Sequence, residues 1–305
     1  MSQNNKHVSI GILIGVVGSI LFSAKAIIIK LSLQLGSDPA TLLALRMIFS
    51  LPFFWAAYLF QAYKKPQNPL NLKDVLKIIF LGFLGYYFSS YMDFLGLQYL
   101  SAGLERIILY LSPTIVVLLS ALILKKPIQL KQWLALVITY LGVITVFADD
   151  VVMSDQILLG ALFVFISAFS YAIYLLLSGE LVHRVGSIRL VCYASSTSMV
   201  CSLIQALILN PDALMTQSAQ VYSLSLINAF FCTFLPMLLV MMSVSRIGSS
   251  LSSQAGMIGP VATIFFAWLF LNELPGFIQL IGTCIVLIGI GVLLTIKNPA
   301  RPSSS

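Results

Sequence analysis

Residues 101–126 have the sequence SAGLERIILYLSPTIVVLLSALILKK. After the charged pair Glu105 and Arg106, the segment is apolar up to Lys125, apart from small hydroxyl residues, Tyr110 and Pro113 near its middle. A helix needs about 20 apolar residues to cross the roughly 30 Å hydrocarbon core of a bilayer. The segment therefore predicts a membrane-spanning helix with a proline near its centre and charges inside the membrane.

Similar apolar stretches recur along the chain of 305 residues, of which 59% are hydrophobic and only 9% charged. The mean hydropathy of +1.01 lies far outside the range of soluble globular chains. Lipid offers no partner to an unpaired backbone amide, and the alternating strands of a barrel are absent, so the spans must be helices. The sequence predicts an all-α membrane protein with ten transmembrane helices. They are expected at residues 8–33, 38–61, 76–97, 101–122, 130–148, 156–179, 188–209, 221–243, 248–271 and 276–296.

Basic residues occupy every second gap between these stretches and none of the gaps between. Loops rich in Lys and Arg face the cytoplasm, so both termini are expected to be cytoplasmic. This assigns the net charge of +7 to membrane topology and not to a nucleic-acid partner. The basic loop residues are Lys6, Lys64, Lys65, Lys73, Lys77, Lys125, Lys126, Lys131, Arg184, Arg189, Arg246, Lys297 and Arg301. The opposite gaps carry Asp38, Asp149, Asp150, Asp155, Asp212 and Glu273.

The chain repeats itself at an offset of 147 residues. The offset pairs Pro113 with Pro260, and the boundaries of the expected spans also coincide. Five helices per copy is an odd number, so the second copy must be inverted in the bilayer, as in many secondary transporters. We expect two inverted five-helix repeats, at residues 1–150 and 151–297, followed by a polar tail at 298–305. Other identical pairs are Leu104 and Leu251, Leu122 and Leu269, Gln132 and Gln279, Gly142 and Gly289, and Phe22-Ser23 and Phe169-Ser170.

The two matched prolines are expected near the centres of the fourth and ninth helices. Each proline removes one helical hydrogen bond and frees a carbonyl, which favours a kink or a hinge. Proline is also simply tolerated in membrane helices, so the symmetric placement of Pro113 and Pro260 carries the prediction of a hinge.

Six charged residues lie inside the expected spans, where each costs at least ~2.5–3.5 kcal/mol near the bilayer centre. Lys30 and Arg106 are near enough to the outer surface to snorkel. Lys25 and Arg46 lie too deep for that, and must face a polar cavity or pair with acids. Two alternatives stay open at this point: a static salt-bridge network that locks four helices together, or a solvated pocket for a charged ligand. The six residues are Lys25, Lys30, Arg46, Asp93, Glu105 and Arg106.

Helical spacing groups polar residues on three faces and favours the pocket. In the second and third of these faces, small hydroxyl residues are equally typical of close helix packing. The faces comprise Tyr86, Ser89, Ser90 and Asp93; Ser167, Ser170, Tyr171 and Tyr174; and Ser249, Ser253, Gly256, Pro260 and Thr263. The predicted substrate site consists of Lys25, Arg46, Tyr86, Ser89, Asp93, Glu105, Arg106, Tyr110, Ser170, Tyr174 and Ser253.

The intramembrane charges comprise four cations and two anions, so an anionic or zwitterionic ligand fits best, with its carboxylate or phosphate at Arg46 or Lys25. Asp93 and Glu105 could instead take an amine, or a proton that couples transport to a gradient. Enzymatic chemistry is not expected, because the two histidines, His7 and His183, lie in loop segments and no nucleotide-binding GxxxxGK[ST] motif occurs. The four cysteines lack metal-ligand spacing, so neither a metal nor a cofactor is predicted.

The chain resembles the ten-helix EamA-type members of the drug/metabolite transporter superfamily. The resemblance rests on LFSAKAIIIKL (21–31), ATLLALRMIFSLPFF (40–54), GLQYLSAGLERIILYLSPTIVVLLSALILKK (96–126) and SSLSSQAGMIGPVATIFFAWLFLNELPGFIQLIGTCIVLIGIGVLL (249–294). It implies export of amino acids or related metabolites across a bacterial inner membrane, through a central cavity between two halves. By position, Lys30, Arg46, Pro113, Pro260 and Glu273 match residues that members of the family often carry.

Two features depart from the family pattern: Lys125-Lys126 stands where many members end the fourth helix with an acid, and the cluster of Asp93, Glu105 and Arg106 is unusually charged. The sequence therefore leaves two functional hypotheses. The first is a secondary exporter of a small charged metabolite, working in the bilayer as a monomer or homodimer. The second is a lipid or polyprenyl-phosphate translocase on the same scaffold, which needs a lateral opening between helices. A channel is less favoured, because rings of like charge are not evident.

Overall fold

The computed structural model describes residues 3–64, 69–109, 111–124, 130–148, 155–256, 259–272, 274 and 276–294, and this part of the chain is helical and contains no strand. The first half comprises α1 (Gln3–Gln34), α2 (Pro39–Lys64), α3 (Leu72–Gly82), η1 (Phe83–Phe88), α4 (Ser89–Leu97), α5 (Ala102–Leu109), α6 (Ser112–Leu124) and α7 (Leu130–Ala148). The second half comprises α8 (Asp155–Val185), α9 (Ser187–Leu209), η3 (Pro211–Leu214), α10 (Ala219–Ala229), η4 (Phe230–Phe234), α11 (Leu235–Ala255), α12 (Gly259–Leu271) and α13 (Phe277–Leu294).

Seven helical stretches of the described chain are long and apolar enough to cross a membrane. They match the first four and the sixth to eighth of the expected spans. Two shorter apolar helices, Ala262–Leu271 and Leu280–Gly289, lie within the expected ninth and tenth. An all-helical protein with multiple spans is therefore confirmed, whereas the number ten and the cytoplasmic position of the termini stay predictions.

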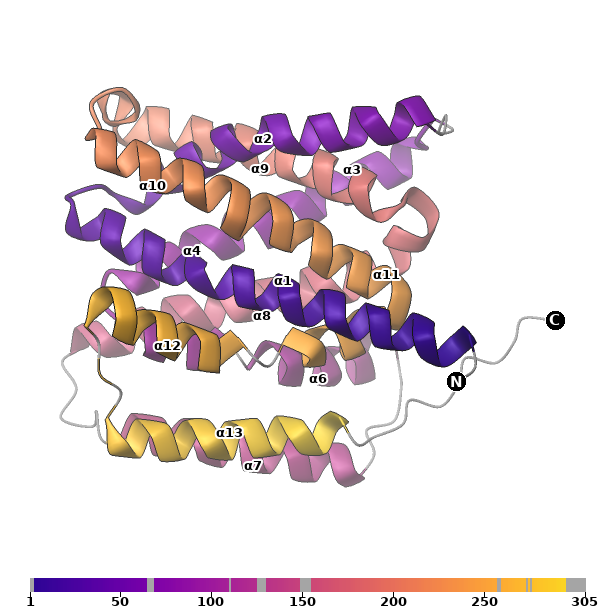
Figure 1. Ribbon diagram of the computed structural model, residues 1–305, viewed down its shortest axis with the longest axis vertical. Coiled ribbons are helices and arrows are strands. Elements are labelled where there is room, and N and C mark those ends of the chain that lie inside the picture. Colours follow the sequence, from indigo (N-terminus) through magenta and orange to yellow (C-terminus); the bar gives the residue numbers. More distant parts are fainter. Residues whose placement is uncertain are drawn as a thin grey trace.

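The helices cross the molecule side by side as one bundle (Figure 1). α1 runs through the middle, between α11 and α12, and packs along both. α7 and α13 pack along each other at one edge of the bundle. The beginning of α1 and the end of α13 lie on the same side of the molecule.

The helix bounds repeat at the offset of 147 residues. α3 corresponds to α10, η1 to η4 and α6 to α12, and in each pair the first residues are 147 positions apart. The counterparts run in opposite directions: α2 begins on the left of Figure 1, where α1 ends, whereas its counterpart α9 ends on the left, where it leads to α10. The division into domains at residue 150 itself stays a prediction, because the residues around it lie outside the described part.

The sequence predicted that the two matched prolines kink continuous helices. In the structure, they do not. Each stands at the second residue of a new helix: Pro113 in α6 and Pro260 in α12. Proline is favoured in the first turn of a helix, where its missing N–H would be unpaired anyway. The expected fourth span is therefore covered by α5 and α6, and the expected ninth by the end of α11 and by α12, and the hinge stays a prediction.

Two π-helical turns interrupt the third span and its counterpart, at η1 and η4. Sequence analysis found neither turn: no proline lies near η1, and Pro236, at the second residue of α11 directly after η4, was not used. Glycine at 85 allows the close packing of η1 on α8, since a Cβ there would lie 2.3 Å from a ring carbon of Tyr174. Turns of this kind are frequent at functional sites, and η1 contributes Tyr86 to the site described below.

Candidate functional site

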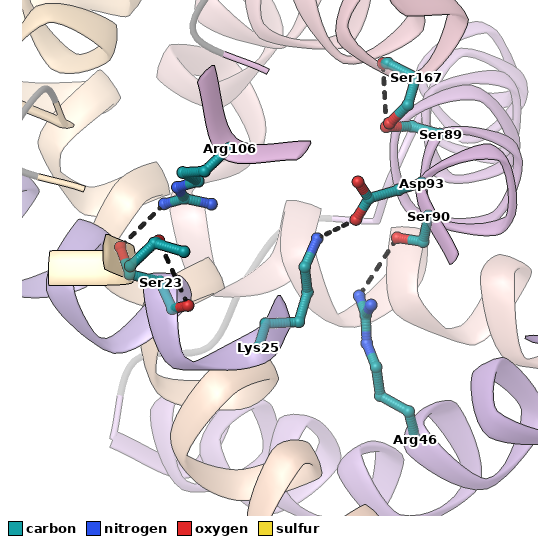
Figure 2. A network of polar contacts seen from close by, with 9 residues as sticks. Ser23, Lys25, Arg46, Ser89, Ser90, Asp93, Arg106 and Ser167 are labelled. Atoms are coloured by element: carbon teal, nitrogen blue, oxygen red, sulfur yellow. Dashed lines mark hydrogen bonds and ion pairs between the residues drawn. The ribbon is translucent and has the colours of Figure 1, made fainter. Parts of the chain in front are cut away.

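Five charged residues of the first half, which we call the charged cluster, lie close together inside the bundle: Lys25, Arg46, Asp93, Glu105 and Arg106. A buried ion pair lies at its centre. Lys25 of α1 places its Nζ 2.5 Å from Oδ2 of Asp93 in α4, and the two side chains are only 3% and 1% exposed (Figure 2). The ammonium group also lies 4.5 Å from the centre of the Phe22 ring. Desolvation of both charges is costly and is offset only by good geometry and further partners. The pair thus fixes α1 against α4 deep in the protein.

Arg46 of α2 lies beside this pair and is fully buried. Its Nη2 donates to Ser90 Oγ at 3.3 Å, and its guanidinium lies 5.3 Å from the centre of the Phe94 ring. Among the described residues, no acceptor reaches its Nε or Nη1. A guanidinium has five N–H donors, so Arg46 retains unused hydrogen-bonding capacity.

Glu105 and Arg106 approach from α5. The carboxyl of Glu105 is completely buried and lies beside that of Asp93, within hydrogen-bonding reach. Arg106 donates from Nη2 to Ser23 Oγ at 3.0 Å and lies 5.5 Å from the centre of the Phe22 ring. The expected snorkelling of Arg106 to the outer surface is therefore wrong, because its side chain points into the bundle (Figure 2).

Lys30 is half-buried, and its snorkelling to the outer surface stays a prediction. Its Nζ donates to the backbone carbonyl of Leu100 at 2.5 Å, just beyond the end of α4. Leu100 lies in the connection between α4 and α5, outside both helices, so Lys30 gives its backbone carbonyl a donor. Lys30 thus links α1 to the connection before α5, and it is not one of the residues that line the cavity described below.

A cavity of about 110 Å³ lies beside the charged cluster. One water needs roughly 10–15 Å³ on this measure, so the cavity has room for several waters or a small molecule. Helices of both halves surround it. The lining residues are Gly15, Ser19, Phe22, Lys25, Gly85, Tyr86, Ser89, Ser90, Arg106, Leu109, Ser112, Ser167, Tyr171, Tyr174, Leu175, Pro236, Met237, Val240, Met241, Ser252 and Gly256.

The structure brings part of the predicted site to the cavity. Lys25, Tyr86, Ser89, Arg106 and Tyr174 line it. The remaining described members do not: Arg46, Asp93 and Glu105 lie buried behind the cavity wall, and Ser170 donates to the backbone carbonyl of Leu84 at 2.7 Å. Tyr110 and the side chain of Ser253 lie outside the described residues.

Sequence analysis missed one wall of the cavity. Gly15, Ser19 and Phe22 lie on α1 at helical spacing and line it together with Lys25. The same spacing rule that grouped Tyr86 with Ser89 would have found them. Met237 and Met241 of α11 were also missed, because a methionine in an apolar span gives no signal of its own.

Hydroxyl groups join α8 to η1 and α4 across the cavity. The phenolic oxygens of Tyr86 and Tyr174 are 2.7 Å apart, and their rings pack with centres 4.9 Å apart. The hydroxyls of Ser89 and Ser167 are 3.1 Å apart. Since α8 belongs to the second half, these contacts hold the two halves together around the cavity.

Serines of α1 bind backbone carbonyls at the facing ends of α11 and α12. Pro260 has no N–H to give to the carbonyl of Gly256, four residues earlier. Ser19 Oγ donates to that carbonyl at 2.5 Å, and Ser23 Oγ donates to the carbonyl of Gly259 at 3.1 Å. Ser19 therefore replaces the helical hydrogen bond that Pro260 removes, and Ser23 adds a second contact between α1 and the start of α12.

The arrangement suits binding better than covalent chemistry. Lys25 and Arg106 offer positive charge at one side of the cavity, and serine and tyrosine hydroxyls, aromatic rings and methionines form the rest. Among the described residues, no group of three or more His, Cys, Asp or Glu is placed to hold a metal ion. A small molecule with an anionic group and an apolar body would be complementary to this lining.

Comparison with known proteins adds independent information. Residues 9–148 and 158–295 each match the model of the EamA-like transporter family. The chain is 30% identical over 283 residues to the uncharacterized transporter YcbK of Bacillus subtilis (strain 168), covering 91% of this chain and 90% of that protein. It is 24% identical over 222 residues to the uncharacterized transporter YdfC of the same organism, covering 72% and 71%.

A solved crystal structure has a similar fold. It superposes with a TM-score of 0.71 over 94% of this chain and 97% of that chain. The sequence identity is only 16%, so the likeness concerns the fold alone.

Proposed function

Because this chain belongs to the EamA-like transporter family, we propose that it is a secondary transporter that exports a small anionic or zwitterionic metabolite by alternating access. The family and the apolar helices make the chain a membrane transporter with multiple spans. The ligand, the mechanism and the location in a bacterial inner membrane are our proposal.

The cavity between the two halves is the observation that carries the proposal. Its lining residues come from both halves: α1 and η1 belong to the first half, and α8 and α11 to the second. Inverted-repeat transporters bind their substrates at such an interface, near the middle of the membrane. A ligand bound there contacts both halves, so it is sensitive to their relative movement.

The charges in the lining support an anionic ligand. Lys25 and Arg106 are the ionised side chains that line the cavity in the described part of the chain, and both are cations. A carboxylate or phosphate group bound between them would form charge-assisted hydrogen bonds. An amino acid or a related compound fits this proposal if its ammonium group faces the hydroxyls of Tyr86 or Ser90.

The shape of the cavity supports a state that is closed at one end. The lining extends along α1 from Lys25 back to Gly15, about 15 Å towards the beginning of the helix. Asp93, which pairs with Lys25, and the neighbouring Arg46 and Glu105 are buried and do not line the cavity. If the termini are cytoplasmic, this is an inward-facing state, and the charged cluster closes the outer end.

Flux measurements in reconstituted vesicles test this function. We expect an unbiased comparison of metabolites between cells with and without the protein to identify an anionic or zwitterionic candidate, whose flux is then measured. Lys25→Gln should lower the flux about tenfold or more, because it removes the charge that faces the ligand. Lys30→Gln is the matched control, since Lys30 lies on the same helix but donates to Leu100 outside the cavity. Equal flux in the two variants would contradict the proposal.

The same preparation separates the exporter from a translocase of lipid or polyprenyl phosphate. A translocase should move a fluorescent phospholipid or polyprenyl phosphate between leaflets, whereas an exporter should move only the soluble metabolite. Reporter fusions after α2 and α13 test the proposed cytoplasmic termini. The mass of the purified protein in detergent distinguishes a monomer from a homodimer.

A further inference from the structure

Glu105 is a buried carboxyl group that no hydrogen-bond donor of the described residues reaches. Within the described part of the chain, neither of its carboxyl oxygens has a hydrogen-bond partner, and the side chain is 0% exposed. The second oxygen of the neighbouring Asp93, Oδ1, also lacks a donor, while Oδ2 accepts from Lys25. An ionised carboxylate without donors in such a place would be strongly destabilising.

A single proton resolves both deficiencies. Placed on Glu105, it neutralises that carboxyl and lets its O–H donate to the carboxylate of Asp93, which lies within reach. Two carboxyl groups in contact in a buried site share a proton, because like charges so close cannot both ionise. We propose that Asp93 and Glu105 form a proton-binding site that is separate from the cavity wall.

The groups that face this carboxyl pair come from several helices. Lys25 from α1 and Arg106 on α5 itself interact with Glu105. Arg46 from α2 faces Asp93, and Cys232 from η4 faces Arg46 and Lys25. α12 packs on α5 but has no ionisable residue between Gly259 and Leu271.

α8 and α7 also pack on α5. α8 brings the neutral phenols of Tyr171 and Tyr174 to the cavity, and α7 carries the phenol of Tyr140. The cations nearby hold one negative charge on the carboxyl pair. They do not supply the hydrogen bonds that a second negative charge would need.

Lys25 connects the proton site to the cavity, because it binds Asp93 and also lines the cavity. This step rests on the proposed function. When an anionic ligand binds the ammonium group of Lys25, Asp93 loses its counter-charge, and the buried pair takes up one further proton. The anion adds one negative charge and the proton adds one positive charge, so the net charge of the cluster is unchanged. Anion and proton therefore move together.

Infrared spectroscopy of the purified, lipid-reconstituted protein at neutral pH tests the shared proton without any substrate. We expect a C=O stretching band of a protonated carboxylic acid that shifts in heavy water. Glu105→Gln should abolish the band, while its amide keeps a donor towards Asp93. Glu180→Gln is the matched control, because Glu180 is exposed on α8 and should leave the band unchanged.

Lys25→Met tests the link to the cavity, since it imitates the departure of the ammonium group from Asp93. We expect the intensity of the acid band to double, because Asp93 then also takes a proton. If Lys25→Met does not fold, Lys25→Gln replaces it, since an amide keeps the hydrogen bond without the charge. A band that survives Glu105→Gln would overturn the proton site, and an unchanged intensity without the lysine charge would overturn the link. Neither result depends on flux, so the transport proposal is tested separately.

Discussion

The two halves of the molecule share their helix bounds but differ in what they bury. At the offset of 147 residues, α3, η1 and α6 coincide with α10, η4 and α12. The charged cluster nevertheless belongs to the first half alone. The positions equivalent to Lys25, Arg46, Asp93, Glu105 and Arg106 are Ala172, Tyr193, Val240, Ser252 and Ser253. The equivalent backbone in the second half forms without these charges, which is consistent with the proposal that the first half carries them for function.

Removal of the carboxylate of Asp93 should give the largest effect. Asp93→Leu leaves Lys25 as an unpaired buried charge, which costs ~3–5 kcal/mol. The matched variant is Val240→Leu, at the equivalent position of the second half, and we expect it to cost less than ~1.5 kcal/mol. Thermal unfolding in detergent measures both.

The double variant Lys25→Met/Asp93→Leu sharpens this comparison. Replacement of a buried ion pair by apolar side chains is often neutral or stabilising. We expect the double variant to regain the stability that Asp93→Leu loses, but not to transport. If it regained transport as well, the ion pair would have only a structural role.

The packing of η1 on α8 should give the next largest effect. Gly85→Ala places a methyl group 2.3 Å from Cγ of Tyr174, and we expect overpacking to cost ~1–3 kcal/mol. In the second half, the equivalent position is Cys232, which already has a side chain. Gly291→Ala is the control, because nothing lies within 4 Å of its Cβ position and alanine favours a helix. Equal unfolding temperatures for the two alanine variants would show that η1 tolerates the methyl group.

A smaller effect is expected where α1 binds the interrupted helix of the second half. Ser19→Ala removes the hydroxyl that donates to the carbonyl of Gly256, and this should cost about 1 kcal/mol. Ser223→Ala removes a similar bond from the exposed face of α10, and should be close to neutral. Amide hydrogen exchange should increase near Gly256 in the first variant only. The same exchange in both variants would remove Ser19 from this role.

The smallest effect is expected at the exposed ion pair between Arg184 and Asp74, whose atoms Nη2 and Oδ1 are 2.8 Å apart. The arginine side chain is 58% exposed, so water and salt screen the pair. We expect Arg184→Ala to cost ~0.2–1 kcal/mol, and less at high salt. Thermal unfolding at two salt concentrations measures this, and a cost near that of Asp93→Leu would contradict the distinction between buried and exposed pairs.

Much of the fold was accessible from local patterns. The apolar runs predicted the helices, and the offset that pairs Pro113 with Pro260 also relates their bounds. The two prolines were predicted to kink the centre of a helix, but each stands in the first turn of one. The sequence could not distinguish these cases, because a proline is compatible with both a kink and a first turn. The π-helical turn η1 had no signal, since it depends on how the third span packs on its neighbours. Beside η4 the signal was Pro236, which was not used.

The site was accessible only in part. Lys25, Tyr86 and Arg106 were predicted and line the cavity, whereas Arg46, Asp93 and Glu105 were predicted and lie behind its wall. The sequence identified all of them because a charge inside a span is costly and needs a reason. It did not say which of them face a ligand, because that depends on the rotation of each helix against the others.

The sequence by itself determined that the chain is a membrane protein of helices, that its two halves are related, and that the first half buries charge. These properties follow from composition and from spacing along the chain. Lipid offers no hydrogen-bond partner to the backbone, so each long apolar stretch must form a helix. Only the tertiary structure decided that Lys25 pairs with Asp93, that Glu105 lies beside Asp93 without a donor, and that Ser19 completes an interrupted helix. The contacts of Lys25 with Asp93 and of Ser19 with Gly256 join residues 68 and 237 positions apart, and close packing of several helices sets all three arrangements.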